Sequence, residues 1–149
     1  MLSRKSITET IAALLVFLFL YTGFIKYLHF ESFRYALHKS PIITHYSQFI
    51  AIILPGFEIF LTLLLIIPKT RLLGLYLSLI TLLTFTIYLI YMILYSPKLP
   101  CTCGGVISQL TWRQHIFFNL FFILLSLIGI YISNTQVVKS KKNKSLSLI

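Results

Sequence analysis

The two cysteines of this chain lie one residue apart, in the run Cys101-Thr102-Cys103-Gly104-Gly105. A disulfide between Cys101 and Cys103 would close a small ring, and strain in such a ring makes the bond easier to reduce than a structural disulfide. Gly104 and Gly105 leave the backbone free and the sulfur atoms open to an incoming thiolate. The pair therefore favours thiol/disulfide exchange. A pair of inert buried thiols is the alternative.

A histidine follows the cysteines at the start of the next apolar segment. Thr111 and Gln114 have the spacing of a capping box, which predicts a helix that begins beside Thr111 and carries His115 in its first turn. Asn119 lies four residues later and therefore on the same helical face. His115 can exchange protons near neutral pH and could pass one to or from a thiol. A histidine hydrogen-bonded to a loop carbonyl group is the alternative.

The same residues offer a second chemistry, which is metal binding. Cys101, Cys103 and His115 are ligand types that hold copper(I) or zinc. Structural zinc sites usually have four protein ligands, and the chain contains no third cysteine. A resident metal is therefore not predicted, and a copper- or zinc-handling site stays as an alternative.

Glu58 lies near the middle of an apolar segment, where a carboxyl group is costly and is by default a functional-site hypothesis. It follows Pro55-Gly56, which should kink a helix and free a carbonyl group. Lys26 is the candidate partner, although the depths expected for the two residues differ by more than half a helix length. A glutamate that only fixes helix packing is the alternative.

One apolar segment carries a stripe of hydroxyl groups at helical spacing, formed by Ser78, Thr81, Tyr88, Tyr91 and Tyr95. Such a stripe could line a groove for a substrate or a quinone, so a quinone is left open as the cofactor. Hydroxyl residues also join membrane helices, and tyrosines gather at membrane interfaces, which is the alternative reading.

The elements that must position these residues are membrane spans. Of 149 residues, 58% are hydrophobic and 11% are charged, which is outside the range of soluble domains. Four apolar segments reach the length of about 20 residues that a spanning helix needs. We predict an all-α integral membrane protein with a single domain over residues 1–149 and spans at about 7–28, 49–67, 72–95 and 115–133. Although the net charge is +10, the sequence shows neither a basic face nor a nucleic-acid recognition motif, so nucleic acid is not an expected partner.

The distribution of Lys and Arg predicts the orientation of the spans. Eight lie on the side of both termini and of the turn at Lys69 and Arg71, and five lie on the other side. By the positive-inside rule both termini are cytoplasmic, and the cysteine loop faces the periplasm of a bacterial inner membrane. Disulfides persist in that compartment.

Two further segments lie outside the predicted spans. We expect the segment from His29 to Gln48 to lie at the membrane interface. We expect the basic tail over residues 134–149 to be disordered.

The chain resembles MauE-type proteins, the methylamine utilisation family grouped with the DoxX-like four-helix membrane proteins. The resemblance reaches to about residue 133. It rests on the cysteine run with Trp112, His115 and Asn119, and on Tyr21 to Lys26, Phe33, Ser40-Pro41 and Pro55 to Glu58.

This resemblance implies a redox-associated membrane protein that acts with a thioredoxin-like periplasmic partner, or on an exported cysteine-containing substrate. The family is linked to disulfide formation in the methylamine dehydrogenase small subunit. Cys101 and Cys103 would be the exchanging pair, and His115, Asn119 and Glu58 match positions of the family. The proton chemistry of His115 makes it the third predicted catalytic residue. The supporting positions would be Lys26, Glu58, Gly104, Gly105, Trp112 and Asn119. A non-catalytic membrane assembly partner is the remaining alternative, and the oligomeric state is left open.

Overall fold

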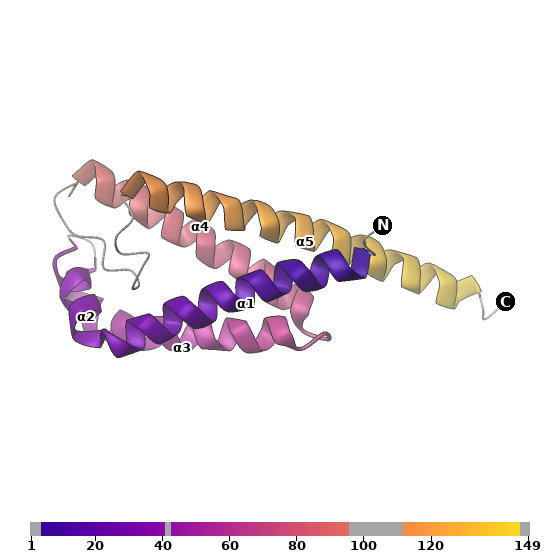
Figure 1. Ribbon diagram of the computed structural model, residues 1–149, viewed down its shortest axis with the longest axis horizontal. Helices are drawn as coiled ribbons and strands as arrows, with labels where there is room; N and C mark the ends of the chain where they lie inside the picture. Colours follow the sequence, from indigo (N-terminus) through magenta and orange to yellow (C-terminus); the bar gives the residue numbers. More distant parts are fainter. Residues whose placement is uncertain (1–3, 41–42, 96–111, 147–149) are drawn as a thin grey trace.

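The computed structural model describes residues 4–40, 43–95 and 112–146, which are almost entirely helical (Figure 1). The predicted thiol run from Cys101 to Gly105 lies outside these residues. So does Thr111, the predicted helix cap. The elements are the α-helices α1 (Arg4–Leu28), α2 (Phe30–His38), α3 (Ser47–Ile66), α4 (Arg71–Tyr95) and α5 (Trp112–Leu146), with a short 3-10 helix, η1 (Thr44–Tyr46), before α3.

Four of these helices, α1, α3, α4 and α5, are long and apolar enough to cross a membrane. This confirms the predicted all-helical membrane protein with four spans, and their ends lie within three residues of the predicted ends, apart from the end of α5. Large apolar side chains also cover the outer faces, with Phe17 71% exposed and Phe117 72% exposed. A helix that is apolar on every face suits a surrounding of lipid.

The four long helices form an antiparallel bundle (Figure 1). α1 packs most extensively against α3, and α4 packs most extensively against α5. The tight turn between α3 and α4 is closed by a hydrogen bond from the Thr70 amide to the Ile67 carbonyl oxygen, at 3.1 Å. The N-terminal end of α1 and the C-terminal end of α5 lie towards one end of the bundle, and α2 lies at the other end.

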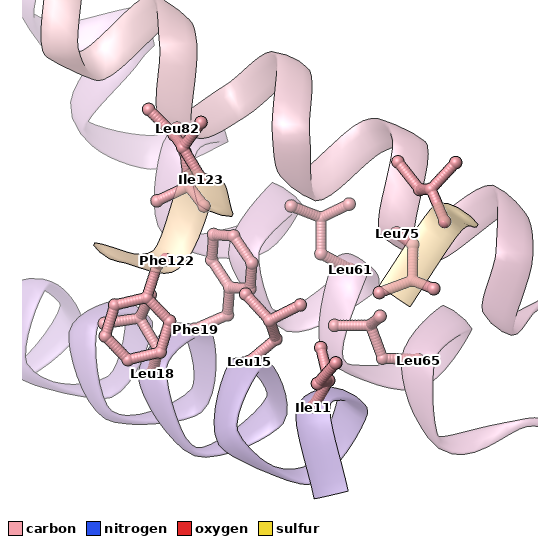
Figure 2. Close-up of a cluster of buried hydrophobic side chains, with 11 residues drawn as sticks. Ile11, Leu15, Leu18, Phe19, Leu61, Leu65, Leu75, Leu82, Phe122 and Ile123 are labelled. Atoms are coloured by element: carbon pink, nitrogen blue, oxygen red, sulfur yellow. The ribbon is translucent and has the colours of Figure 1, made fainter. Parts of the chain in front are cut away.

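A hydrophobic core fills the part of the bundle nearer the termini (Figure 2). Every long helix contributes to it. The buried members are Ile11, Leu15, Leu18, Phe19, Leu61, Leu65, Leu75, Leu82, Phe122, Ile123 and Ile130. Close packing of this kind fixes the spacing of the four helices, so the polar side chains nearer α2 are held on a rigid frame.

α2 covers the opposite end of the bundle. Its buried residues Phe33 and Leu37 pack with Ala51 of α3 in a second small apolar cluster. Directly after α2, the fully buried Ser40 hydroxyl donates to the sulfur of Met92 in α4, at 3.6 Å. The segment expected at the interface therefore contains a short helix that is tied to both α3 and α4.

The C-terminal end differs from the expectation of a disordered tail from residue 134. α5 continues as a helix to Leu146. The sequence after Gly129 contains no glycine or proline up to that residue, and its lysines and glutamine are good helix formers. The change from apolar to basic composition therefore marks the end of the apolar span without ending the helix.

Candidate functional site

A cavity of about 350 Å³ lies among all five α-helices, in the half of the bundle that α2 covers. Its walls are mostly apolar, and Leu18, Phe19 and Leu82 of the hydrophobic core contribute to them. Lys26, Glu58, His115 and Asn119 also line it. The structure therefore brings four of the predicted site residues to one cavity.

Lys26 of α1 and Glu58 of α3 form an ion pair, in which Lys26 Nζ donates to Glu58 Oε1 at 2.5 Å. The two side chains are only 4% and 1% exposed. This is the partner that the sequence indicates for Glu58. Because removing ions from water is costly, the burial of both charges at one point makes this pair the most unusual feature of the described residues.

The depth mismatch expected for this pair does not occur, because α1 and α3 are offset along the bundle. A side-chain carbon placed on Gly23 would lie 3.3 Å from Glu58 Cβ and 3.3 Å from the Pro55 carbonyl oxygen. Gly23 is thus level with Glu58, and Lys26 lies less than one turn further along α1. α3 therefore begins about six residues, or about 9 Å, beyond the end of α1.

The kink expected at Pro55 and Gly56 does not interrupt the helix, because α3 runs through both residues as one element. Position 56 faces open space, because a side-chain carbon there would meet nothing within 4 Å. The close approach of α1 to α3 depends on Gly23 instead, which allows the Glu58 side chain to lie against α1.

Aromatic rings surround the ammonium group of Lys26. Its Nζ lies 5.8 Å from the ring centre of Phe33 in α2 and 5.3 Å from that of Phe85 in α4. Cation–π attraction at such distances partly replaces lost hydration. Together with the ion pair, these contacts join α1, α2, α3 and α4 around one charge.

The second oxygen of Glu58, Oε2, is buried and has no hydrogen bond to any described residue. Thr22 of α1 places a hydroxyl near the carboxylate. That hydroxyl donates to the Phe19 carbonyl oxygen of its own helix, at 3.4 Å. Oε2 lies against α1, 3.4 Å from a side-chain carbon placed on Gly23, and remains an acceptor without a donor among the described residues.

α5 supplies the remaining polar residues. His115 is 8% exposed and Asn119 is 5% exposed, and both line the cavity from one face of the helix, as their four-residue spacing predicts. α5 begins at Trp112, one residue after the predicted cap, so His115 does lie in its first turn. Of Trp112 itself only the backbone is described.

The predicted thiols and glycines, Cys101, Cys103, Gly104 and Gly105, lie between the end of α4 and the start of α5, outside the described residues. Within the described ranges, no three His, Asp or Glu residues are grouped closely enough to hold a metal ion. The metal alternative needs both cysteines and therefore stays a prediction.

The five residues of the hydroxyl stripe on α4 have different surroundings. Ser78 and Thr81 donate to carbonyl oxygens of their own helix, those of Gly74 at 2.7 Å and Leu77 at 2.8 Å. Tyr95 is 68% exposed and stacks on Tyr91. Of the stripe, only Tyr88 lines the cavity. Four of the five stripe residues thus lie outside the cavity lining, and the helix-bonded Ser78 and Thr81 and the exposed Tyr95 agree with the alternative reading.

The cavity wall from α4 contains residues that the sequence reading missed. Phe85, Leu89 and Met92 recur at intervals of four and three residues and line the cavity with Tyr88. This helical spacing could have identified them as one face of α4. The spacing does not stand out, because α4 is apolar on every face.

Comparison with models of known protein families shows to which family this chain belongs. A family model described as methylamine utilisation protein MauE matches residues 4–132. The chain belongs to the MauE family. The MauE match contains all the cavity-lining residues named above, and ends before the basic part of α5. MauE membership links this membrane protein to methylamine utilisation. No significant match is found among curated proteins or among solved structures.

Proposed function

We propose that the protein is a membrane-embedded thiol/disulfide exchange protein that works with a thioredoxin-like periplasmic partner in the maturation of exported proteins. The observation that carries this proposal is the position of the only two cysteines. They lie one residue apart in the segment that joins α4 to α5, directly before the helix that holds His115 in its first turn.

The connection fits the proposed chemistry. Tyr95 ends α4 and Trp112 begins α5 at the end of the bundle where α2 lies (Figure 1). A segment held at both ends can present thiols to a soluble partner. The N-terminal end of α5 carries a partial positive charge, which favours a thiolate close to it.

Exchange proceeds through a mixed disulfide. The Cys103 thiolate attacks the partner's disulfide, a bond forms between Cys103 and one partner sulfur, and the other partner sulfur leaves as a thiolate. The Cys101 thiolate then attacks the Cys103 sulfur and releases the reduced partner, which leaves a disulfide between Cys101 and Cys103. Run in reverse, the same steps oxidise the partner. His115 would accept or return the proton of a thiol.

The proposed location is the bacterial inner membrane, with both termini in the cytoplasm and the cysteine segment facing the periplasm. The support is the excess of Lys and Arg beside the two termini and in the turn between α3 and α4. On the periplasmic side a disulfide can persist and exchange with exported proteins.

Complementation of a gene deletion tests the function. The readout is the number of free thiols in exported disulfide-containing proteins, measured by alkylation and gel shift. We expect Cys101→Ser, Cys103→Ser and the double variant to fail, and Thr102→Ser, which leaves both thiols in place, to complement fully. Full complementation by the double serine variant would instead favour a non-catalytic assembly partner.

A further inference from the structure

We propose that the cavity around Lys26 and Glu58 binds the head group of a lipid-soluble quinone or quinol. The first observation is that the buried ion pair of Lys26 and Glu58 lies beside a cavity. An ion pair that only joined α1 to α3 would be packed on all sides, whereas this pair borders a cavity of about 350 Å³. That volume lies in the range of small-molecule sites, which are mostly apolar with a few polar groups.

The polar atoms at the cavity match both redox forms of a quinone. Lys26 Nζ has three N–H groups, and one of them is directed to Glu58 Oε1, so the ammonium group can also donate to a quinone carbonyl oxygen. Glu58 Oε2 is a buried acceptor without a donor among the described residues. A quinol hydroxyl group would supply that donor. Asn119 adds an amide that both donates and accepts.

The aromatic residues among those that line the cavity suit a flat ring. The ring centres of Phe33 and Phe85 lie 5.8 Å and 5.3 Å from the Lys26 ammonium nitrogen, and both residues line the cavity. Aromatic faces at this place can stack on a planar head group. The rest of the wall is supplied by aliphatic residues such as Leu54, Leu82 and Leu89, which suit an isoprenoid tail.

The location of the cavity favours a ligand that dissolves in the bilayer. Lys26, Glu58 and Phe85 all belong to helices long and apolar enough to span a membrane. A lipid-soluble carrier is therefore a better match than a water-soluble metabolite.

The binding site is formed by described residues and does not need the thiols. Its role in electron transfer rests on the proposed function. When the dithiol of Cys101 and Cys103 closes to a disulfide it gives up two electrons and two protons, and a quinone that takes up both becomes a quinol.

The test is a titration of the full-length protein in phospholipid nanodiscs with decylubiquinone and, separately, decylubiquinol, with empty nanodiscs as the blank. We expect saturable binding of one molecule per chain. Glu58→Gln should weaken quinol binding about tenfold, because a charge-assisted hydrogen bond is lost. Glu9→Gln, the same change outside the cavity, should bind as the unmodified protein does.

A second variant keeps the proposal testable if Glu58→Gln does not fold. Ala36 of α2 lines the cavity and is only partly buried, so Ala36→Phe adds a ring to the cavity without disturbing the core. It should abolish binding of both forms. The proposal is overturned if folded protein shows no saturable binding, if Ala36→Phe binds normally, or if native mass spectrometry finds only a phospholipid that quinone does not displace.

The cysteine variants separate the two proposals. The double serine protein should bind decylubiquinone as well as the unmodified protein does. Trapped mixed disulfides without quinone binding would refute the cavity proposal alone. Quinone binding without any mixed disulfide would refute the thiol proposal alone.

Discussion

Lys26 Nζ donates to Glu58 Oε1 at 2.5 Å, and this pair joins α1 to α3 inside the membrane-spanning part of the bundle. Both side chains are almost completely buried. The charge of each residue is balanced mainly by the other, with the rings of Phe33 and Phe85 as additional partners of the ammonium group. The stability of the bundle should therefore depend on the two residues jointly.

Loss of one partner should be more harmful than loss of both. Lys26→Met leaves a buried carboxylate alone, so we expect the free energy of unfolding to fall by about 3–5 kcal/mol. The double variant Lys26→Met with Glu58→Met should lose less than either single variant, because no uncompensated charge remains. Reversible unfolding in mixed detergent micelles measures these differences.

A second ion pair provides the control for this prediction. Arg71 Nη1 lies 3.8 Å from Glu9 Oε1, near the termini, and the Glu9 side chain is about half exposed. Glu9→Gln should change the free energy of unfolding by less than about 1 kcal/mol. Equal losses from Glu9→Gln and Lys26→Met would show that burial does not govern the inner pair.

Gly23 should be required for the contact between α1 and α3. An added methyl group would lie 3.3 Å from Glu58 Cβ and from the Pro55 carbonyl oxygen, and this overpacking, about 1–3 kcal/mol, should exceed the gain in helix preference that alanine brings. Gly56→Ala is the matched control. Nothing lies within 4 Å of its added methyl group, and alanine favours helix by about 1 kcal/mol over glycine. The unfolding temperature should fall for Gly23→Ala and rise for Gly56→Ala relative to the unmodified protein. Equal unfolding temperatures for the two variants would contradict the prediction that the contact at Gly23 resists a methyl group.

The spans and two side-chain pairs could be predicted from the sequence. Apolar segments of spanning length locate the four helices, and the four-residue interval places His115 and Asn119 on one face. Glu58 is recognisable because a carboxyl group is rare in an apolar segment, and Lys26 is the only basic residue inside the first span. These predictions are possible because charged residues are rare in apolar segments and because residues four apart lie on one face of a helix.

The cavity and the relative depths of the helices could not be predicted. The offset that brings Lys26 within reach of Glu58 depends on where α2 and η1 place the start of α3, and no local sequence pattern indicates that position. Phe85 and Met92 look like any other apolar residues of α4. The helical part of the tail beyond residue 134 is also not predicted, because a basic composition is typical of a disordered tail, although lysine favours helix.

The orientation proposed for the membrane can be checked with the native cysteines. In intact spheroplasts, a membrane-impermeant maleimide should label Cys101 and Cys103 after mild reduction, because their segment is proposed to face the periplasm. In a protein whose two cysteines are serine, Lys69→Cys in the turn between α3 and α4 should label only after lysis. The reverse pattern would place the thiols in the cytoplasm.

Capture of a mixed disulfide is the most direct measurement of the thiol proposal. The Cys101→Ser and Cys103→Ser variants are each expressed in cells. Acid stops thiol exchange, and an alkylating agent then blocks the free thiols. The purified protein is analysed on non-reducing gels and by mass spectrometry. We predict that one variant accumulates a disulfide-linked thioredoxin-like or exported protein, which is released by a reductant and absent from the double serine control. If neither variant captures a partner although both insert normally, the thiol-exchange account is contradicted.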